Sequence, residues 1–283
     1  MIKLVFIAVL LLIILIAVFL YMIMPGENRD YSRFVGLMYA HRGLHEPARE
    51  DNNMHCVPEN SLEAFKRARE AGYGVELDVQ YTKDKKLVVF HDANLKRMCG
   101  VDAKVADYDY EELSKFRLKD TDQKIPLFEE VLKTLEDVPL VCEIKTHNGN
   151  FNDRLCEDTY NLLKDYKGDY CIESFSPYLV RWFRDNHPEI IRGQLSCGMK
   201  NEMSLLLPVR IAMTHLLINF VGRPDFIAYR HSDMRKLGFV LCKKIYHPLI
   251  VAWTARGEKE QMQAWKKADA VIFEKYEDDS PVE

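Results

Sequence analysis

The sequence lacks several features that would define a class of protein at once. Its seven cysteines include no C-x-x-C pair and are odd in number, which argues against a disulfide scaffold and mildly favours a reducing environment. Long blocks of Lys or Arg are absent and the formal net charge is -4, so nothing indicates a nucleic-acid groove. The 283 residues contain no internal repeat and no low-complexity tract, and 48% of them are hydrophobic. The chain can therefore bury one large core or two small ones.

The beginning of the chain lacks charge altogether. No charged residue occurs from Leu4 to Met24, and at ~1.5 Å per residue a helix of this length spans a bilayer core of ~30 Å. The run exceeds the ~7–15 apolar residues of a signal peptide, and no A-x-A-like cleavage site follows it. We therefore expect a retained transmembrane helix at 1–24 rather than a cleaved signal peptide. A linker at 25–36 and one globular domain at 37–283 would follow.

The sequence leaves the orientation of this helix open. Lys3 precedes the span while Arg29 and Arg33 follow it, so the positive-inside rule gives almost no bias. The cysteine pattern favours a reducing compartment, whereas the short N-terminal tail suits a signal anchor with the domain outside. We expect a single-pass membrane protein with the side of its catalytic domain unresolved.

Beyond the linker, β-type runs alternate with helical patterns. Asn60 and Glu63 have capping-box spacing, so Asn60 is predicted to cap the first helix. Strands that alternate with helices favour a parallel α/β architecture, and eight or so such units in about 250 residues fit a closed (β/α)8 TIM barrel better than an open sheet. The β-type runs are GLMYA, VELDVQY, KLVVF, PLVCEI, YCIESF, IRGQLS, DFIAY, FVLCKK, LIVAWTA and DAVIFE, and the helical patterns include 61–71, 125–137, 177–187 and 258–268.

The segment 203–222 is unusually apolar. Its only potentially charged groups are Arg210 and His215. One interpretation is an amphipathic outer helix of the barrel that has Pro208 near its start. The alternative is a helix whose apolar face rests on the membrane surface beside the N-terminal anchor.

Two of the expected strands carry charged side chains on one face. Side chains at i and i+2 of a strand point the same way, so Glu76 projects with Asp78, and Glu143 projects with Lys145. Buried carboxylates without partners are costly. These carboxylates must therefore be neutralised by cations or lie at the solvent-accessible end of a barrel.

Several other polar side chains follow directly after expected strands. His41 and Arg42 come after MYA, and His91 comes after LVVF. Barrel enzymes build their active sites at the carboxyl ends of the strands, so these groups are expected to converge there. Three carboxylates suit Ca²⁺ or Mg²⁺, Arg42 and Lys145 can neutralise phosphate, and two histidines can supply a base and an acid. The chemistry indicated is hydrolysis of a phosphodiester.

At this point the sequence resembles the glycerophosphodiester phosphodiesterase family over essentially all of residues 38–275. Taken in order, these motifs are highly specific. They are AHRG (40–43), PENSLEAFKRAREAG (58–72), VELDVQYTKDKKLVVFHDANLKRM (75–98), IPLFEEVL (125–132) and CEIK (142–145), with weaker matches in ESFSP and VAWTAR.

The resemblance implies a (β/α)8 barrel that hydrolyses glycerophosphodiesters to glycerol phosphate and an alcohol. Lysophospholipids and other lipid-derived diesters are a further expected substrate class, because the N-terminal anchor would hold the domain near them. A glycerol hydroxyl would attack phosphorus, and water would open the resulting cyclic phosphate. The roles carried over by motif are an acid/base pair (His41, His91), a divalent Ca²⁺ or Mg²⁺ site (Glu76, Asp78, Glu143), phosphate binding (Arg42, Lys145), orientation of neighbours in the site (Glu59) and apolar substrate walls (Phe175, Trp253).

The chain also departs from the family pattern. The loop between HRG and PENS is long and charged, Glu274 stands where the family often has Asp, and a compact insertion is reduced to residues 93–124. These departures bear on the substrate rather than the reaction. Two alternative hypotheses remain: a phospholipase C-like barrel that cleaves intact lipids, and a catalytically inactive, membrane-tethered binding barrel. An H-x-K phospholipase D is disfavoured because no histidine is followed two residues later by Lys.

Overall fold

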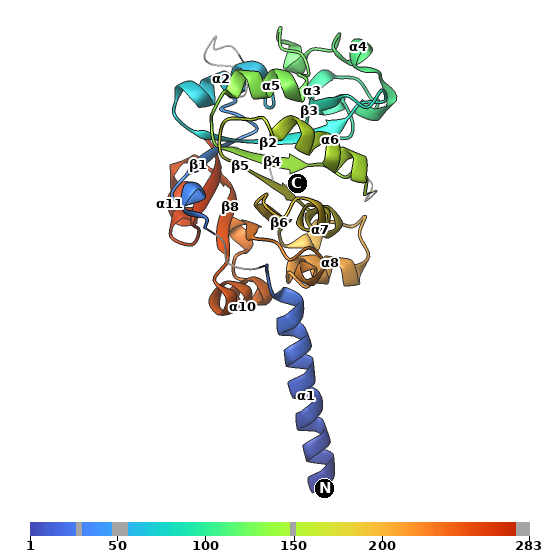
Figure 1. The fold of residues 1–283 in the computed structure, drawn as a ribbon, viewed down its shortest axis with the longest axis vertical. Coiled ribbons are helices and arrows are strands. Elements are labelled where there is room, and N and C mark those ends of the chain that lie inside the picture. The colour runs from blue at the N-terminus through green and yellow to red at the C-terminus, as the bar shows by residue number, and fades with distance from the viewer. Residues whose placement is uncertain (27–29, 47–55, 148–150, 276–283) are drawn as a thin grey trace.

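The computed structural model describes residues 1–26, 30–46, 56–147 and 151–275. Its centre is a closed barrel of eight parallel strands, in which β1 pairs with both β2 and β9 and a short strand, β3, adds to β2 in antiparallel orientation. The expected (β/α)8 barrel is confirmed (Figure 1). The strands are β1 (Met38–His41), β2 (Gly74–Tyr81), β3 (Leu87–Val89), β4 (Leu140–Ile144), β5 (Tyr170–Ser174), β6 (Arg192–Ser196), β7 (Phe226–Arg230), β8 (Leu249–Arg256) and β9 (Ala270–Glu274).

Helices cover the outside of the barrel because each parallel pair of strands needs a crossover. Strand residues such as Val75, Leu77 and Val79 face these helices and are fully buried. The helices are α2 (Leu62–Glu70), α3 (Lys96–Cys99), α4 (Tyr110–Leu113), α5 (Phe128–Leu135), α6 (Asp153–Leu163), α7 (Pro177–Asn186), α8 (Leu207–Thr214), α9 (Asn219–Gly222), α10 (Leu237–Tyr246) and α11 (Gly257–Trp265).

Two local predictions are wrong. The run FVLCKK lies inside α10 rather than in a strand, because Phe239 and Cys242 are buried three residues apart while the lysines face outward. The cap of α2 is Ser61, whose side chain accepts the backbone N–H of Ala64 at 3.2 Å. Asn60 instead adopts a left-handed backbone (φ 53) and donates to Asp78.

The segment 203–222 forms two helices rather than one. Pro208 lies in the first turn of α8, as expected, and α8 ends at Thr214. Leu216 then takes a left-handed conformation (φ 59), and α9 follows. Residues 93–124 pack around a small separate core that includes Leu95, Leu113 and Leu118.

The N-terminal helix α1 (Ile2–Ile23) is long and apolar enough to cross a membrane, a property that a signal sequence shares. It projects away from the barrel (Figure 1). Only its last turn is docked, between α9 and α10, where Ile23 is buried. The part of the 25–36 segment that the structure describes runs from there toward β1, and Gly26 donates its N–H to the carbonyl oxygen of Pro224 at 2.7 Å.

Candidate functional site

Three carboxylates meet at the carboxyl ends of β2 and β4. Glu76, Asp78 and Glu143 each offer an oxygen, and these oxygens lie within 4.8 Å of one another. All three side chains are buried. The register of the parallel strands sets Asp78 directly beside Glu143. The predicted alternation on each strand therefore builds one acidic cluster inside the barrel.

Two cations neutralise part of this cluster. The Nζ atom of Lys145 lies 2.9 Å from Asp78 Oδ1 and 2.7 Å from Glu143 Oε2. Arg42 donates its backbone N–H to Glu76 at 3.0 Å, and its guanidinium lies 3.4 Å from Asp78. Burial is possible for these carboxylates because cations and hydrogen-bond donors surround them.

The carboxylates differ in their proton affinity. Burial and the charges of Asp78 and Glu143 raise the pKa of Glu76 well above its usual range. Burial also raises the pKa of Glu143, although Lys145 opposes this effect. Burial would raise the pKa of Asp78 too, but the charges of Lys145, His91 and Arg42 outweigh it and hold that pKa well below its usual range.

A tight turn positions Arg42 after β1. Arg42 and Gly43 both have positive φ angles, 56° and 81°. A Cβ at Gly43 would lie 2.8 Å from the Cβ of Ala64, so this position has no room for a side chain. The turn directs the Arg42 guanidinium to Glu59, whose Oε1 accepts from it at 2.8 Å.

We predict that Gly43→Ala destabilises the fold by more than the ~1–3 kcal/mol that a strained backbone alone costs, because the clash with Ala64 is added. Gly100→Ala is the matched control, since Gly100 has a similar φ of 72° but open space at its Cβ. The measurement is urea unfolding of both variants. Equal losses in the free energy of unfolding would contradict this account.

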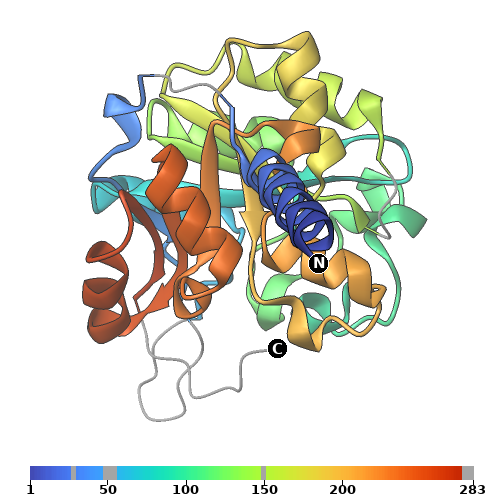
Figure 2. The ribbon, with the colours of Figure 1, turned by 90° about the horizontal axis from the view of Figure 1, so that it is seen from below.

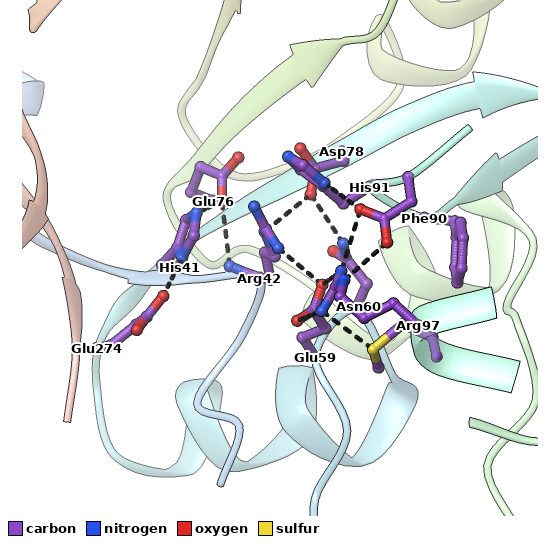
Figure 3. A network of polar contacts seen from close by, with 12 residues as sticks. His41, Arg42, Glu59, Asn60, Glu76, Asp78, Phe90, His91, Arg97 and Glu274 are labelled. Carbon is purple, nitrogen blue, oxygen red and sulfur yellow. Dashed lines mark hydrogen bonds and ion pairs between the residues drawn. The ribbon is translucent and has the colours of Figure 1, made fainter. Parts of the chain in front are cut away.

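His41 is held by the last strand of the barrel. Its Nδ1 lies 2.6 Å from Glu274 Oε1 (Figure 3). The other oxygen of Glu274 accepts from Arg256 at 2.8 Å. Burial opposes ionisation of Glu274, but its hydrogen bond to His41 and nearby positive charge keep its pKa far below the usual range. An ionised carboxylate only accepts, so Nδ1 of His41 carries the proton. Nε2 of His41 therefore carries the lone pair, and it lies 3.9 Å from Glu76 Oε2 in the acidic cluster.

His91 is oriented in the same way. Strand β3 turns back along β2, and the N–H of Phe90 donates to the carbonyl of Asp78, which sets His91 beside the acidic cluster. The Nδ1 of His91 lies 2.6 Å from Asp92 Oδ1. Burial would raise the pKa of Asp92, but His91 and Arg97 lower it to about 2. Nδ1 of His91 is therefore a donor as well.

A chain of ion pairs connects Asp92, the partner of His91, to Arg42, which follows His41 in the chain. Arg97 contacts Asp92 and Glu59, each at 2.7 Å, and Glu59 in turn binds Arg42 (Figure 3). Asn60 adds a hydrogen bond of 2.8 Å to Asp78. The predicted residue Glu59 thus holds two arginines in place.

Beside His91 lies an open cavity of about 630 Å³. Glu143, Lys145 and Phe175 line it, and so do Arg97 and His147. Phe175 meets Trp253 in an edge-to-face contact with ring centroids 5.8 Å apart, and the Arg230 guanidinium lies over Trp253. The two predicted apolar residues therefore adjoin one another at the edge of the site.

Sequence reasoning missed the partners of the two histidines. The sequence indicates Glu274 only as a departure from a family motif, His91-Asp92 only as a dipeptide of no specificity, and gives no role to Arg97 or Arg256. The signal for Glu274 was its place at the end of the last barrel strand, the rule that found Glu143. Asp92 adjoins His91 in sequence, but only the folded chain reveals that their side chains pair.

The three-carboxylate cluster fits a divalent cation of the hard, oxygen-preferring kind. Glu76, Asp78 and Glu143 are buried close together, and the charges of Asp78 and Glu143 oppose ionisation of Glu76, a repulsion that a cation would relieve. A second group of potential ligands, His41, His45 and Glu274, is less suited, because Glu274 already binds both His41 and Arg256.

Known structures share this fold. The chain aligns with an Oleispira antarctica phosphodiesterase, solved in complex with the product sn-glycerol-3-phosphate, at a TM-score of 0.66 and 20% identity over 84% of this chain and 93% of that one. It aligns with a Thermotoga maritima glycerophosphodiester phosphodiesterase at a TM-score of 0.59 and 25% identity over 84% and 93%. The first likeness shows the fold alone.

Sequence comparison identifies the family. The chain is 32% identical over 190 residues to a glycerophosphodiester phosphodiesterase of Caldanaerobacter subterraneus subsp. tengcongensis, covering 63% of this chain and 74% of that protein. It is 32% identical over 220 residues to a lysophospholipase D of Mus musculus, covering 73% and 62%. The glycerophosphoryl diester phosphodiesterase family model matches residues 41–275. The chain therefore belongs to this family.

Proposed function

We propose that this protein is a membrane-anchored, metal-dependent hydrolase of glycerophosphodiesters, including lysophospholipids, that releases an alcohol and a glycerol phosphate. The observation that carries this proposal is the buried cluster of Glu76, Asp78 and Glu143 between two histidines, each with a carboxylate on Nδ1. Family membership gives the reaction class. The catalytic domain would begin near residue 37, and α1 would hold it at the bilayer.

Glu76, Asp78 and Glu143 would hold the divalent cation. When bound, Ca²⁺ or Mg²⁺ would supply positive charge for a phosphate oxygen. Lys145 and Arg42 lie at the same place and would neutralise further charge on the phosphate. Glu59 would keep Arg42 in position.

The two histidines would move the protons. Burial lowers the pKa of His41 and of His91, with Arg42 and Lys145 contributing to the respective shifts, so both rings are predominantly neutral near pH 7. With Nδ1 protonated, each ring has a lone pair on Nε2. One histidine would take a proton from the attacking oxygen, and the other, which must first take a proton from solvent on Nε2, would give that proton to the leaving oxygen.

Glu274 would act as a positioning residue for His41. We expect Glu274→Gln to lower kcat by about 10- to 100-fold, the range found for the carboxylate partners of metal-binding histidines, with little change in KM because Glu274 does not contact the substrate. The carboxylate raises the pKa of His41, so its removal should lower that pKa and move the acidic limb of the pH–rate profile to lower pH. Glu274→Asp keeps the charge and should retain most activity. An unshifted profile in the Gln variant would contradict the role.

Cation binding should depend on pH. The raised pKa values of Glu76 and Glu143 mean that a proton competes with the cation for the cluster. Affinity should therefore rise with pH, by at most ~10-fold per pH unit for each proton displaced. Titration calorimetry in buffers of different ionisation enthalpy would measure the protons released. Binding that is independent of pH and buffer would show that the cluster is not the cation site.

The substrate class is tested by choline release from glycerophosphocholine and from lysophosphatidylcholine. Phe175 and Trp253 give the site an apolar wall. If this wall binds the substrate, Trp253→Ala should raise KM for lysophosphatidylcholine more than for the soluble diester. Turnover of glycerophosphocholine alone would restrict the proposal to soluble diesters.

A further inference from the structure

One surface of the barrel surrounds the docked end of α1. We call it the anchor face and define it as segment 203–222, with α8 and α9, together with α10. Figure 2 looks at it from below, with α1 rising between α10 on one side and α8 on the other. Four side-chain hydrogen bonds fix the end of α1 here: Asn219 donates to Ile23 O, Arg223 donates to Tyr21 O and to Met24 O, and Tyr246 donates to Leu20 O.

The anchor face carries most of the exposed large apolar side chains of the globular part. After α1, twelve such side chains are exposed among the described residues, and eight of them lie between Met203 and Ile245. Leu206 and Leu207 are the plainest cases, with exposed fractions of 75% and 62%. Clustered apolar exposure of this kind marks an interaction surface rather than ordinary scatter.

The same stretch is basic, although the whole chain is acidic. The anchor face, residues 203–222 and 237–246, contains Arg210, Lys243 and Lys244 and no Asp or Glu, against a net charge of -4 for the protein. Apolar side chains beside an excess of positive charge match an anionic lipid surface.

The anchor face also connects to the candidate site. Met199 and Met213 pack together in a small hydrophobic cluster on the inner side of α8. Leu205, Phe175 and Trp253 pack against the same cluster. Apolar side chains thus lead from the exposed leucines to the apolar wall beside the cavity.

We propose that the anchor face lies on the membrane that α1 spans, with Leu206 and Leu207 inserted among the lipid headgroups of a bilayer that contains anionic lipid. The surface is continuous with the anchor itself, and its positive charge complements such a bilayer. A second consequence rests on the proposed function: a lysophospholipid would pass from the bilayer to the site along α8.

The direct test places an environment-sensitive nitrobenzoxadiazole probe at Leu207→Cys in the full chain. Cys56 and Cys99, the two cysteines that are not buried, are first replaced by Ser. The protein is reconstituted in phosphatidylcholine vesicles with and without phosphatidylserine, and quenching by lipids with a spin label on the acyl chain is measured. The control probe is at Lys115→Cys, an exposed position just beyond α4 at the far end of the molecule (Figure 1).

Quenching at residue 207 but not at residue 115, stronger with phosphatidylserine, is the expected result. Equal and weak quenching at both positions would overturn the proposal. So would a fluorescence change at residue 207 that follows protein density instead of lipid label, because that would assign the face to a second copy of the chain. None of these readouts requires turnover, so they stand even if the proposed activity fails.

Activity tests the second consequence. The double variant Leu206→Glu, Leu207→Glu should lose about tenfold or more in the hydrolysis of bilayer-borne lysophosphatidylcholine. It should hydrolyse soluble glycerophosphocholine at the wild-type rate, which shows that the fold and the site are intact. Met262→Glu is the matched control, because Met262 is 61% exposed on α11, away from this face. Unchanged hydrolysis of both substrates by the double variant would overturn the lipid route.

Discussion

Replacement of either His41 or His91 by Ala is expected to lower kcat for glycerophosphocholine by ~10²–10⁴-fold, the usual contribution of a positioned acid or base. Each ring is held by an ionised carboxylate, His41 by Glu274 and His91 by Asp92. Steady-state kinetics at saturating cation measures the loss.

Two controls make this result specific. Cation affinity should be nearly unchanged in both variants, because the cluster of carboxylates remains. His187→Ala should keep wild-type activity, since His187 stacks on Tyr160 on the outside of the barrel. A variant of His41 or His91 with more than about a tenth of wild-type kcat would remove that residue from the acid/base pair.

Loss of the cation should have an effect of similar size. We expect chelation to reduce turnover by ~10³-fold or more, because a bound divalent ion contributes several kcal/mol to stabilising phosphoryl charge. Glu143→Gln should reduce cation affinity and turnover together, while Asp78 still pairs with Lys145.

Glu173→Gln is the matched control for the cluster. Glu173 lies beside Glu143 in the sheet and is equally buried, and burial, together with the charge of Glu143, raises the pKa of Glu173 well above the usual range. The Glu173→Gln variant, which keeps the size of this side chain, should therefore bind the cation with nearly wild-type affinity. Equal losses in the two variants would indicate a general effect of disturbing the barrel interior rather than a defined cation site.

The sequence predicted those parts of the site that depend on local periodicity. The i, i+2 spacing on β2 and β4 was enough to place Glu76, Asp78, Glu143 and Lys145 together, because the register of parallel strands follows from a closed barrel. The position of residues after a strand was enough to place His41 near them. The fold class followed from the alternation of strands and helices and is confirmed.

The failures arose where tertiary contacts override local signals. A short apolar run such as FVLCKK is compatible with either a strand or a buried helix. It forms part of helix α10 because the chain must cross over from β7 to β8 at this point. Strand β3 was expected like the others but lies outside the barrel as the return of a hairpin. Asn60 has the spacing of a cap, yet its amide is taken by Asp78. The pairing of His41 with Glu274 joins residues 233 apart in sequence, beyond any local pattern.

The central claim is that the carboxylate cluster and the histidines hydrolyse a glycerophosphodiester with the help of a divalent cation. The most direct measurement is release of sn-glycerol 3-phosphate from glycerophosphocholine by the full chain in detergent, with and without EDTA, and after adding back Mg²⁺ or Ca²⁺. The account predicts turnover that EDTA abolishes, that one of the two ions restores and that His41→Ala does not show. A cation bound with the pH dependence described above, but no turnover of this diester or of lysophosphatidylcholine, would contradict it and assign the barrel a binding role.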